Sequence, residues 1–182
     1  MIRNFLLLLF LINFSAKPSP TWEIHRVIGV IDGDTIVIEN GAEIRYIGID
    51  TPETVHPYKP IECYGPEASE RNKDLVLNKF ILTERDIKDQ DSYGRYLRYV
   101  YTCEGSINRI LVEEGYAFSY YYPPNLKYYK EYLQCELEAH SHKKGLWFSC
   151  YWYIRYISLG EFLTNFLPLR TVKFRLWLSC QV

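Results

Sequence analysis

Apolar and polar residues alternate along residues 22–49 in the manner of β-strands. Three runs rich in β-branched residues are WEIHRVIGVI at 22–31, TIVIE at 35–39 and AEIRYIGI at 42–49. The turns between them are Asp32-Gly33-Asp34 and Asn40-Gly41, and Asp-Gly and Asn-Gly are strong signals for tight hairpins. We expect a meander of three antiparallel strands, with Asp34 and Asp50 on one rim.

The pattern then changes to loop and helix. Residues 51–64 form a proline-rich loop, and Gly65-Pro66-Glu67 opens a helix, with proline in the first turn and a glutamate near the positive helix end. We expect this helix to run to about Phe80. Two more strands follow, FILTERDIKD and RYLRYVYTC, joined by residues 90–94.

Two further helices are predicted in the second half of the chain. Ser106 caps the first of them, which ends at Gly115. Pro123-Pro124 precedes the second, which Gly145 stops. Apolar or large side chains recur at helical spacing in both, at Ile107, Ile110 and Leu111 and then at Leu126, Tyr129, Leu133, Leu137 and His140.

These elements predict the fold class. Five strands with helices inserted between and after them fit an α+β architecture, a five-stranded OB-fold β-barrel packed with three α-helices. Barrels of this type commonly bind oligonucleotides, although fold analogy alone does not establish an activity.

The two ends of the chain differ in character from this domain, which we place at residues 21–150. Residues 1–16 carry an arginine, the apolar run 5–12 and then Ser15 and Ala16, the layout of a secretory signal peptide. Because the run is shorter than the roughly 20 residues that span a bilayer, we expect no transmembrane helix in the mature chain; an uncleaved anchor is the alternative. Residues 151–182 form an aromatic and basic C-terminal tail of unknown role, which could pack on the barrel, touch a membrane or be an altered reading frame.

Charge and cysteine content restrict the possible chemistry. The formal net charge is −1, and with +3 in the tail and +1 in the leader, residues 17–150 carry −5. Affinity for nucleic acid must therefore come from a local cluster and a bound cation.

Removal of the leader would give a secreted protein, or one in the periplasm or cell envelope. There its five cysteines can oxidise, in a pairing that the sequence leaves open.

One set of residues suits phosphodiester hydrolysis. An enzyme for this reaction must neutralise phosphate charge, position water and stabilise a crowded transition state. Metal, guanidinium and carboxylate groups do this, and the chain supplies such groups in VIDGDT at 30–35, IRYIGIDTPET at 44–54 and DSYGR at 91–95. Singly, each motif is more often a turn or a surface segment.

Together the motifs resemble the staphylococcal nuclease (thermonuclease, micrococcal nuclease) family. VIDGDT, an arginine separated by four residues from DTPET with HP after it, YGPEAS, and D-x-YGR match that family in order and spacing, and the likeness extends from about Val27 to Trp147. The resemblance makes residues 21–150 an SNase-like nuclease domain. It implies a Ca²⁺-dependent endonuclease that cuts DNA and RNA, favours single-stranded or breathing regions, and leaves 3′-phosphates. We expect a monomer with no obligate protein partner.

The resemblance also implies roles for single residues. Arg45 and Arg95 would bind the phosphate and Glu53 the attacking water, while Asp32 would support the metal site from outside its direct ligands. Ca²⁺ would be held by the carboxylates of Asp34 and Asp50 and the backbone carbonyl of Thr51. The residues expected to contact substrate are Tyr93, Tyr120, Tyr122 and Lys59.

Two function classes remain, a working nuclease and a catalytically silent OB-type module that binds nucleic acid or protein. Silent members of the family typically lack an arginine, the glutamate or a metal aspartate, and this chain has all five such side chains. That favours the enzyme. Ser92 and Tyr58 stand where the family commonly has lysines, which weakens the expected phosphate contacts without touching the reaction.

Overall fold

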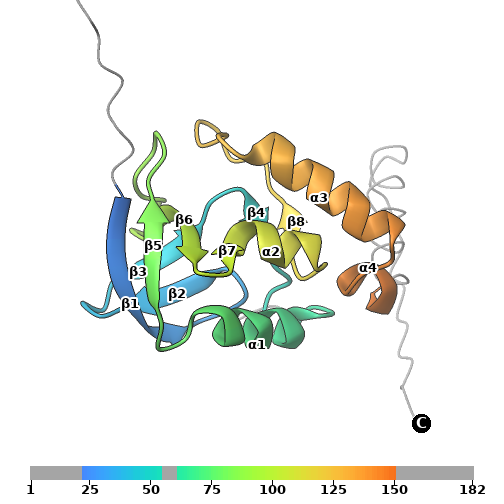
Figure 1. Ribbon diagram of the computed structural model, residues 1–182, viewed down its shortest axis with the longest axis horizontal. Coiled ribbons are helices and arrows are strands. Elements are labelled where there is room, and N and C mark those ends of the chain that lie inside the picture. The colour runs from blue at the N-terminus through green and yellow to red at the C-terminus, as the bar shows by residue number, and fades with distance from the viewer. Residues whose placement is uncertain (1–21, 55–60, 151–182) are drawn as a thin grey trace, which may run out of the picture.

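Five strands form a closed barrel in the computed structural model, which describes residues 22–54 and 61–150 (Figure 1). Hydrogen bonds join the strands in the order β3-β2-β1-β5-β6, and a parallel pairing of β3 with β6 closes the ring, with Arg45 opposite Leu97. The other four pairings are antiparallel. The strands are β1 (Trp22–Val30), β2 (Thr35–Ile38), β3 (Glu43–Tyr46), β5 (Phe80–Glu84) and β6 (Tyr96–Thr102). The predicted α+β fold with an OB-type barrel is confirmed.

The predicted meander is present, but its third strand is shorter than expected. β3 ends at Tyr46, because the backbone turns at Gly48, whose φ of 76° is a conformation that glycine adopts without steric cost. The chain then continues as β4 (Ile49–Asp50), which pairs with β8 (Phe118–Ser119) outside the barrel. Asp50 is therefore carried by a separate two-stranded ribbon.

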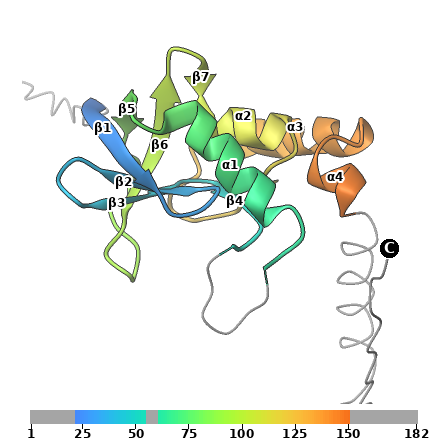
Figure 2. The same ribbon diagram turned by 90° about the horizontal axis from the view of Figure 1, so that it is seen from below.

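Within the described segments, four helices accompany the barrel and lie mostly to one side of it (Figures 1 and 2). They are α1 (Gly65–Val76), α2 (Ile107–Glu113), α3 (Tyr129–Ser141) and the short α4 (Leu146–Ser149), which the sequence did not predict; a small strand, β7 (Gly105–Ser106), precedes α2. The predicted cap of α2 is present, since the side chain of Ser106 accepts a hydrogen bond from the N–H of Arg109.

Two predicted element ends are wrong. The first helix was expected to reach Phe80 but stops at Val76, because Leu77 is extended and Asn78 takes a left-handed φ of 61°. Phe80 instead begins β5, pairing with Arg26 of β1. The strand expected at 80–89 stops at Glu84, where Asp86 accepts the N–H of Ile87 in a local turn.

Buried asparagines join the helices to the barrel. Asn72 of α1 accepts the hydroxyl hydrogen of Tyr46 at 2.9 Å and donates to the carbonyl of Asp32 at 3.0 Å. Asn108 of α2, fully buried, accepts the N–H of Val100 and donates to the carbonyl of Ile47, both at 2.9 Å. Each amide satisfies backbone or hydroxyl groups of buried or half-buried residues, so both fix helix position as well as adding stability.

One disulfide joins the loop before α1 to the C-terminal end of α4. Cys63 and Cys150 are bonded, with their Cα atoms 5.9 Å apart, across 87 positions of sequence. Closing a loop of this length stabilises a fold by about 2 to 5 kcal/mol. Cys103 and Cys135 are unpaired, and Cys180 lies outside the described residues. The structure thus selects one of the pairings that the sequence left open.

No helix in the two described segments is long and apolar enough to cross a bilayer. The predicted signal peptide and the C-terminal tail lie outside those segments and remain predictions.

Truncation of the buried Asn108 is expected to destabilise the fold more than truncation of the exposed Asn40. Asn108→Ala leaves the buried N–H of Val100 and carbonyl of Ile47 unsatisfied, which costs on the order of 2 to 4 kcal/mol in free energy of unfolding. Asn40→Ala removes one exposed bond to the N–H of Ala42 and should cost less than about 1 kcal/mol. Urea denaturation of both variants measures the difference, and equal losses would show that the buried amide has no special role.

Candidate active site

A cleft of about 160 Å³ opens at one rim of the barrel, and it gathers the residues predicted to act in catalysis and metal binding. Its lining consists of Asp32, Asp34, Arg45, Asp50, Thr51, Glu53 and Arg95. These side chains are spread over 64 positions of sequence, so it is the closure of the barrel that brings them together. The expectation that Asp34 and Asp50 share one rim is confirmed.

Adjacent barrel strands place Asp34, Arg45 and Arg95. Asp34 ends the hairpin turn and leads into β2, whose Thr35 pairs directly with Arg45 on β3. Arg95 immediately precedes β6, the parallel neighbour of β3. Gly33 lets the next segment approach closely, because a Cβ atom there would lie 2.7 Å from the side chain of Thr51. Alanine at this position would push the two segments apart.

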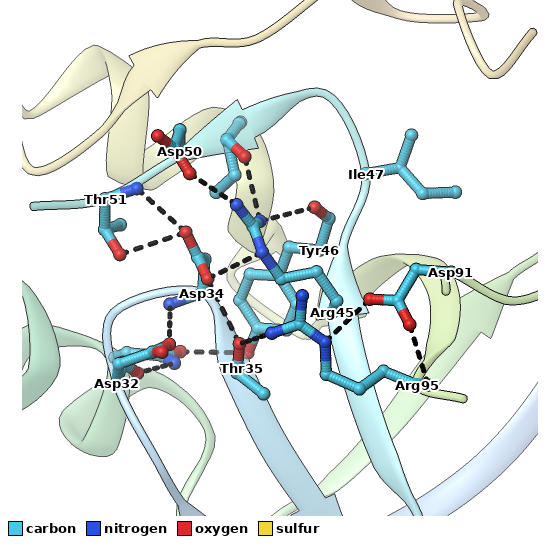
Figure 3. A network of polar contacts seen from close by, with 12 residues as sticks. Asp32, Asp34, Thr35, Arg45, Tyr46, Ile47, Asp50, Thr51, Asp91 and Arg95 are labelled. Carbon is cyan, nitrogen blue, oxygen red and sulfur yellow. Dashed lines mark hydrogen bonds and ion pairs between the residues drawn. The ribbon is translucent and has the colours of Figure 1, made fainter. Parts of the chain in front are cut away.

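Asp34 is the buried centre of the network (Figure 3). One carboxylate oxygen, Oδ2, accepts the N–H of Thr51 at 2.8 Å and its hydroxyl hydrogen at 3.0 Å. The other, Oδ1, accepts the hydroxyl hydrogen of Thr35 at 3.2 Å and lies 3.1 Å from Nε of Arg45. The carboxylate therefore joins β2, β3 and the segment after β4.

Arg45 connects Asp34 with Asp50. Its Nη2 donates to Oδ1 of Asp50 at 2.6 Å, while Nη1 donates to the carbonyls of Tyr46 and Ile49 at 2.9 Å each. A guanidinium presents its donors in a rigid plane, so these bonds fix the orientation of the group as well as its position.

Arg95 is oriented by an aspartate four residues earlier (Figure 3). Oδ2 of Asp91 accepts from Nε of Arg95 at 2.7 Å, and Oδ1 accepts the backbone N–H groups of Tyr93 and Arg95 at 2.9 and 3.0 Å. Nη1 of Arg95 then reaches the hydroxyl of Thr35 at 3.4 Å. Although burial favours the neutral carboxyl, these hydrogen bonds hold the pKa of Asp91 below its ordinary value.

The cleft carries more negative than positive charge. Four carboxylates and two guanidinium groups line it, a formal excess of two negative charges when every group is ionised. Desolvation raises the pKa of Asp32 to about 7, and the charge of Asp34 adds to this shift. Desolvation also raises the pKa of Asp50 to about 6; Arg45 opposes that shift and the neighbouring carboxylates add to it. Such crowding disfavours ionisation of the carboxylates and is relieved by a cation.

The donor chemistry of the cleft fits a hard divalent cation. Asp34 and Asp50 offer carboxylate oxygens and Thr51 a backbone carbonyl, the ligand type that Ca²⁺ prefers. Within residues 22–54 and 61–150, no group of three or more His, Cys, Asp or Glu side chains is arranged to hold a metal. A cation here would thus rest on two carboxylates, one carbonyl and ligands from outside the chain, as in a weak site that substrate completes.

A second cavity of about 260 Å³ adjoins the cleft and shares Arg45, Asp50 and Arg95 with it. All three tyrosines expected to contact substrate, Tyr93, Tyr120 and Tyr122, line this cavity. Tyr93 is 85% exposed, and the rings of Tyr120 and Tyr122 lie 6.0 Å apart between centroids. Lys59, the fourth predicted contact, lies outside the described residues.

Three residues of the site escaped the sequence interpretation. Asp91 belongs to the D-x-YGR motif, and its position four residues before Arg95 was the available sequence signal. Thr35 directly follows Asp34, and its hydroxyl lies between that carboxylate and Arg95. Glu62, whose carboxylate accepts the N–H of Glu53 at 3.0 Å, carries no sequence signal, because a loop separates the two residues.

Fold and site together define an OB-barrel protein with arginines and carboxylates gathered in one cleft at the barrel rim. The chain belongs to the staphylococcal nuclease homologue family, whose model matches residues 43–149. It is 40% identical over 126 residues to "Thermonuclease" of Staphylococcus hyicus, which covers 68% of this chain and 75% of that protein. It is also 40% identical over 128 residues to "Thermonuclease" of Staphylococcus intermedius, covering 69% and 76%. A third relative, "Endonuclease YncB" of Bacillus subtilis (strain 168), is 45% identical over 122 residues, covering 64% of this chain and 58% of the relative.

Asp91→Asn is expected to destabilise the protein in a pH-dependent way. At pH 7 the variant should lose on the order of 1 to 2 kcal/mol, because the charged partner of Arg95 becomes neutral. The pKa of Asp91 is lower in the folded than in the unfolded protein. The wild type should therefore have the larger free energy of unfolding above about pH 4, and its difference from the variant should shrink as the pH falls through the pKa of Asp91 in the folded protein. Urea denaturation of both proteins from pH 7 to pH 3 measures this, and a gap that stays constant would exclude the ion pair as its source.

Proposed function

We propose that the chain is a calcium-dependent endonuclease that hydrolyses phosphodiester bonds of DNA and RNA and leaves 3′-phosphates. The observation that carries the proposal is the meeting of Arg45, Arg95 and Glu53 with Asp34 and Asp50 in one cleft. The relatives named thermonuclease and endonuclease support the same reaction class.

The two arginines would bind the reacting phosphate from adjacent strands. A guanidinium can donate paired hydrogen bonds to phosphate oxygens, and these bonds strengthen as negative charge grows in the transition state. Nε and Nη1 of Arg45 are bonded to Asp34 and to two carbonyls, so Arg45 would turn Nη2 from Asp50 to the phosphate when Asp50 binds the cation. Asp91 holds Arg95 through Nε, leaving the Nη edge directed to the cleft. Lysine offers no such planar fork, so it cannot replace either arginine.

Glu53 would act as the base. Its carboxylate accepts a proton from water as the water oxygen attacks phosphorus, and the bond from phosphorus to the 5′ oxygen breaks. The leaving 5′ oxygen takes up a proton, so the products are a 3′-phosphate and a 5′-hydroxyl.

Asp34, Asp50 and Thr51 would hold Ca²⁺, with Asp32 as a neighbouring support. When bound, the ion supplies positive charge beside the phosphate and relieves the excess of carboxylates in the cleft. A site with so few ligands from the chain suits surroundings where calcium is plentiful. The predicted signal peptide and the Cys63–Cys150 disulfide support export to such a compartment, either secreted or within the cell envelope.

The tyrosine-lined cavity would receive a nucleotide beside the cleaved bond. Aromatic rings stack on any base, and stacking needs a base that is not already paired within a duplex. Tyr93, Tyr120 and Tyr122 therefore favour single-stranded or breathing regions, and Lys59 would add a phosphate contact. We place this activity in residues 21–150 of a monomer, with 1–16 as the signal peptide and 151–182 as a tail without an assigned role.

The decisive experiment is cleavage of single-stranded DNA by the purified mature chain, with Ca²⁺ and then with EGTA. We expect cleavage only with Ca²⁺, and a loss of several orders of magnitude in rate for Glu53→Gln and for Arg95→Lys, with the fold retained. Wild-type-like rates in either variant would remove that residue from the mechanism. A folded wild type that binds DNA without cutting it would instead indicate a silent binding module.

The chemistry of the ends separates this mechanism from other phosphodiester cleavages. Mass spectrometry of oligonucleotide fragments should find phosphate on the 3′ ends and hydroxyl on the 5′ ends for DNA and for RNA. Fragments with 5′-phosphates would mean that the bond to the 3′ oxygen breaks, which contradicts the proposed direction of attack.

A further inference from the structure

Glu53 is held through its backbone by another glutamate. The N–H of Glu53 donates to Oε2 of Glu62 at 3.0 Å, and the N–H of Glu62 donates to the carbonyl of Glu53 at 2.9 Å. This two-bond clamp fixes both polar groups of the Glu53 backbone. The point from which its side chain enters the cleft is thereby fixed as well.

The segment that carries Glu62 packs directly against the residues around Glu53. A Cβ atom on Gly65 would lie 2.9 Å from the carbonyl oxygen of Glu53 and 3.0 Å from that of Pro52. Gly65 also donates its N–H to the carbonyl of Glu62 at 3.1 Å. A shift of residues 62–65 would therefore displace Glu53.

Residues 62–65 are in turn fixed to the helical side of the molecule. Cys63 is bonded to Cys150, which is buried and donates its N–H to the carbonyl of Leu146 at 2.8 Å. Leu146, 1% exposed, donates its N–H to the carbonyl of Gly115 just after α2. The disulfide thus connects the clamp to α4 and, through it, to the core.

We propose that the Cys63–Cys150 disulfide and Glu62 are positioning elements for Glu53, and that full catalytic rate requires the intact bridge. The inference rests on the function proposed above. Glu53 lies outside the barrel strands, after β4, and its backbone is held by this separate connection. A displacement of about 1 Å at a catalytic group can cost on the order of 100-fold in rate.

The bridge should affect turnover more than substrate affinity. Tyr93 and Arg95 lie in the connection between β5 and β6, where Asp91, and not the segment 62–65, holds their backbone and the Arg95 side chain. Loss of the bridge would leave that binding surface in place while Glu53 moves. The expected signature is a lower kcat with a nearly constant KM.

The test compares two matched proteins on single-stranded DNA with saturating Ca²⁺. The bridged reference carries Cys103→Ser and Cys180→Ser, which leaves the buried Cys135 as its one other thiol, and the unbridged protein adds Cys63→Ser and Cys150→Ser. We expect kcat of the unbridged protein to fall by about 10- to 100-fold and KM to change by less than about threefold. Reduction of the bridged reference by dithiothreitol, a dithiol that is itself oxidised to a cyclic disulfide, should lower kcat equally, and reoxidation should restore it.

Two controls separate positioning from general stability. Ile81→Ala in the bridged reference removes core contacts of β5 and lowers the melting temperature, and it should leave kcat unchanged well below that temperature. Glu62→Gln keeps an acceptor for the N–H of Glu53 and should retain most of kcat, whereas Glu62→Ala should lose it to a similar extent as the unbridged protein. This pair decides the question even where the serine variant does not fold.

Failure of the positioning role can be distinguished from failure of the proposed function. An inactive bridged reference, with wild-type chain also inactive, overturns the nuclease itself. An active reference whose kcat survives both reduction and Glu62→Ala overturns the positioning role while leaving the nuclease intact. A loss of kcat in Ile81→Ala as large as in the unbridged protein also overturns it, because stability alone would then explain the effect.

Discussion

The ion-pair network of Asp34, Arg45 and Asp50 is the constraint on which the site depends. Arg45 lies on β3, where the parallel pairing with β6 closes the barrel, and its guanidinium reaches an aspartate on each side. A charge as buried as that of Asp34 is tolerated only when it is paired and hydrogen-bonded, so the network cannot loosen without destabilising the strands that form it. The same contacts that satisfy the buried charge thus define the cleft.

The barrel and the helical side place different parts of the proposed chemistry. Arg45 lies on β3, and Asp34 and Arg95 immediately precede β2 and β6, so hydrogen-bonded barrel strands position all three. Glu53 follows the short β4 and is held by Glu62 and the disulfide instead. Groups that bind charge need a fixed scaffold, and a base needs a fixed distance to the attacked phosphorus. The chain meets these two requirements with two separate structures.

Local signals predicted most of the fold and the cleft. The Asp-Gly and Asn-Gly turns specified the first two hairpins, and three of the four motifs that carry the family resemblance contain all seven residues that line the cleft. Contacts between distant segments had no such signal. The Cys63–Cys150 pairing and the Glu62–Glu53 clamp depend on how α4 and the loop before α1 pack, and the break after Tyr46 depends on the conformation of Gly48. Lys59 and both chain ends lie outside the described residues, so their roles stay predictions.

The charge distribution connects the proposed metal dependence to the rest of the protein. Residues 17–150 carry −5, and the cleft itself has two more carboxylates than guanidinium groups. A polyanionic substrate approaching this surface is repelled unless positive charge is added at the point of contact. Burial raises the pKa values of Asp32 and Asp50, and the neighbouring carboxylates add to both shifts. On the proposed mechanism, one divalent cation therefore answers two electrostatic demands, because it relieves the crowded carboxylates and allows the phosphate to reach Arg45 and Arg95.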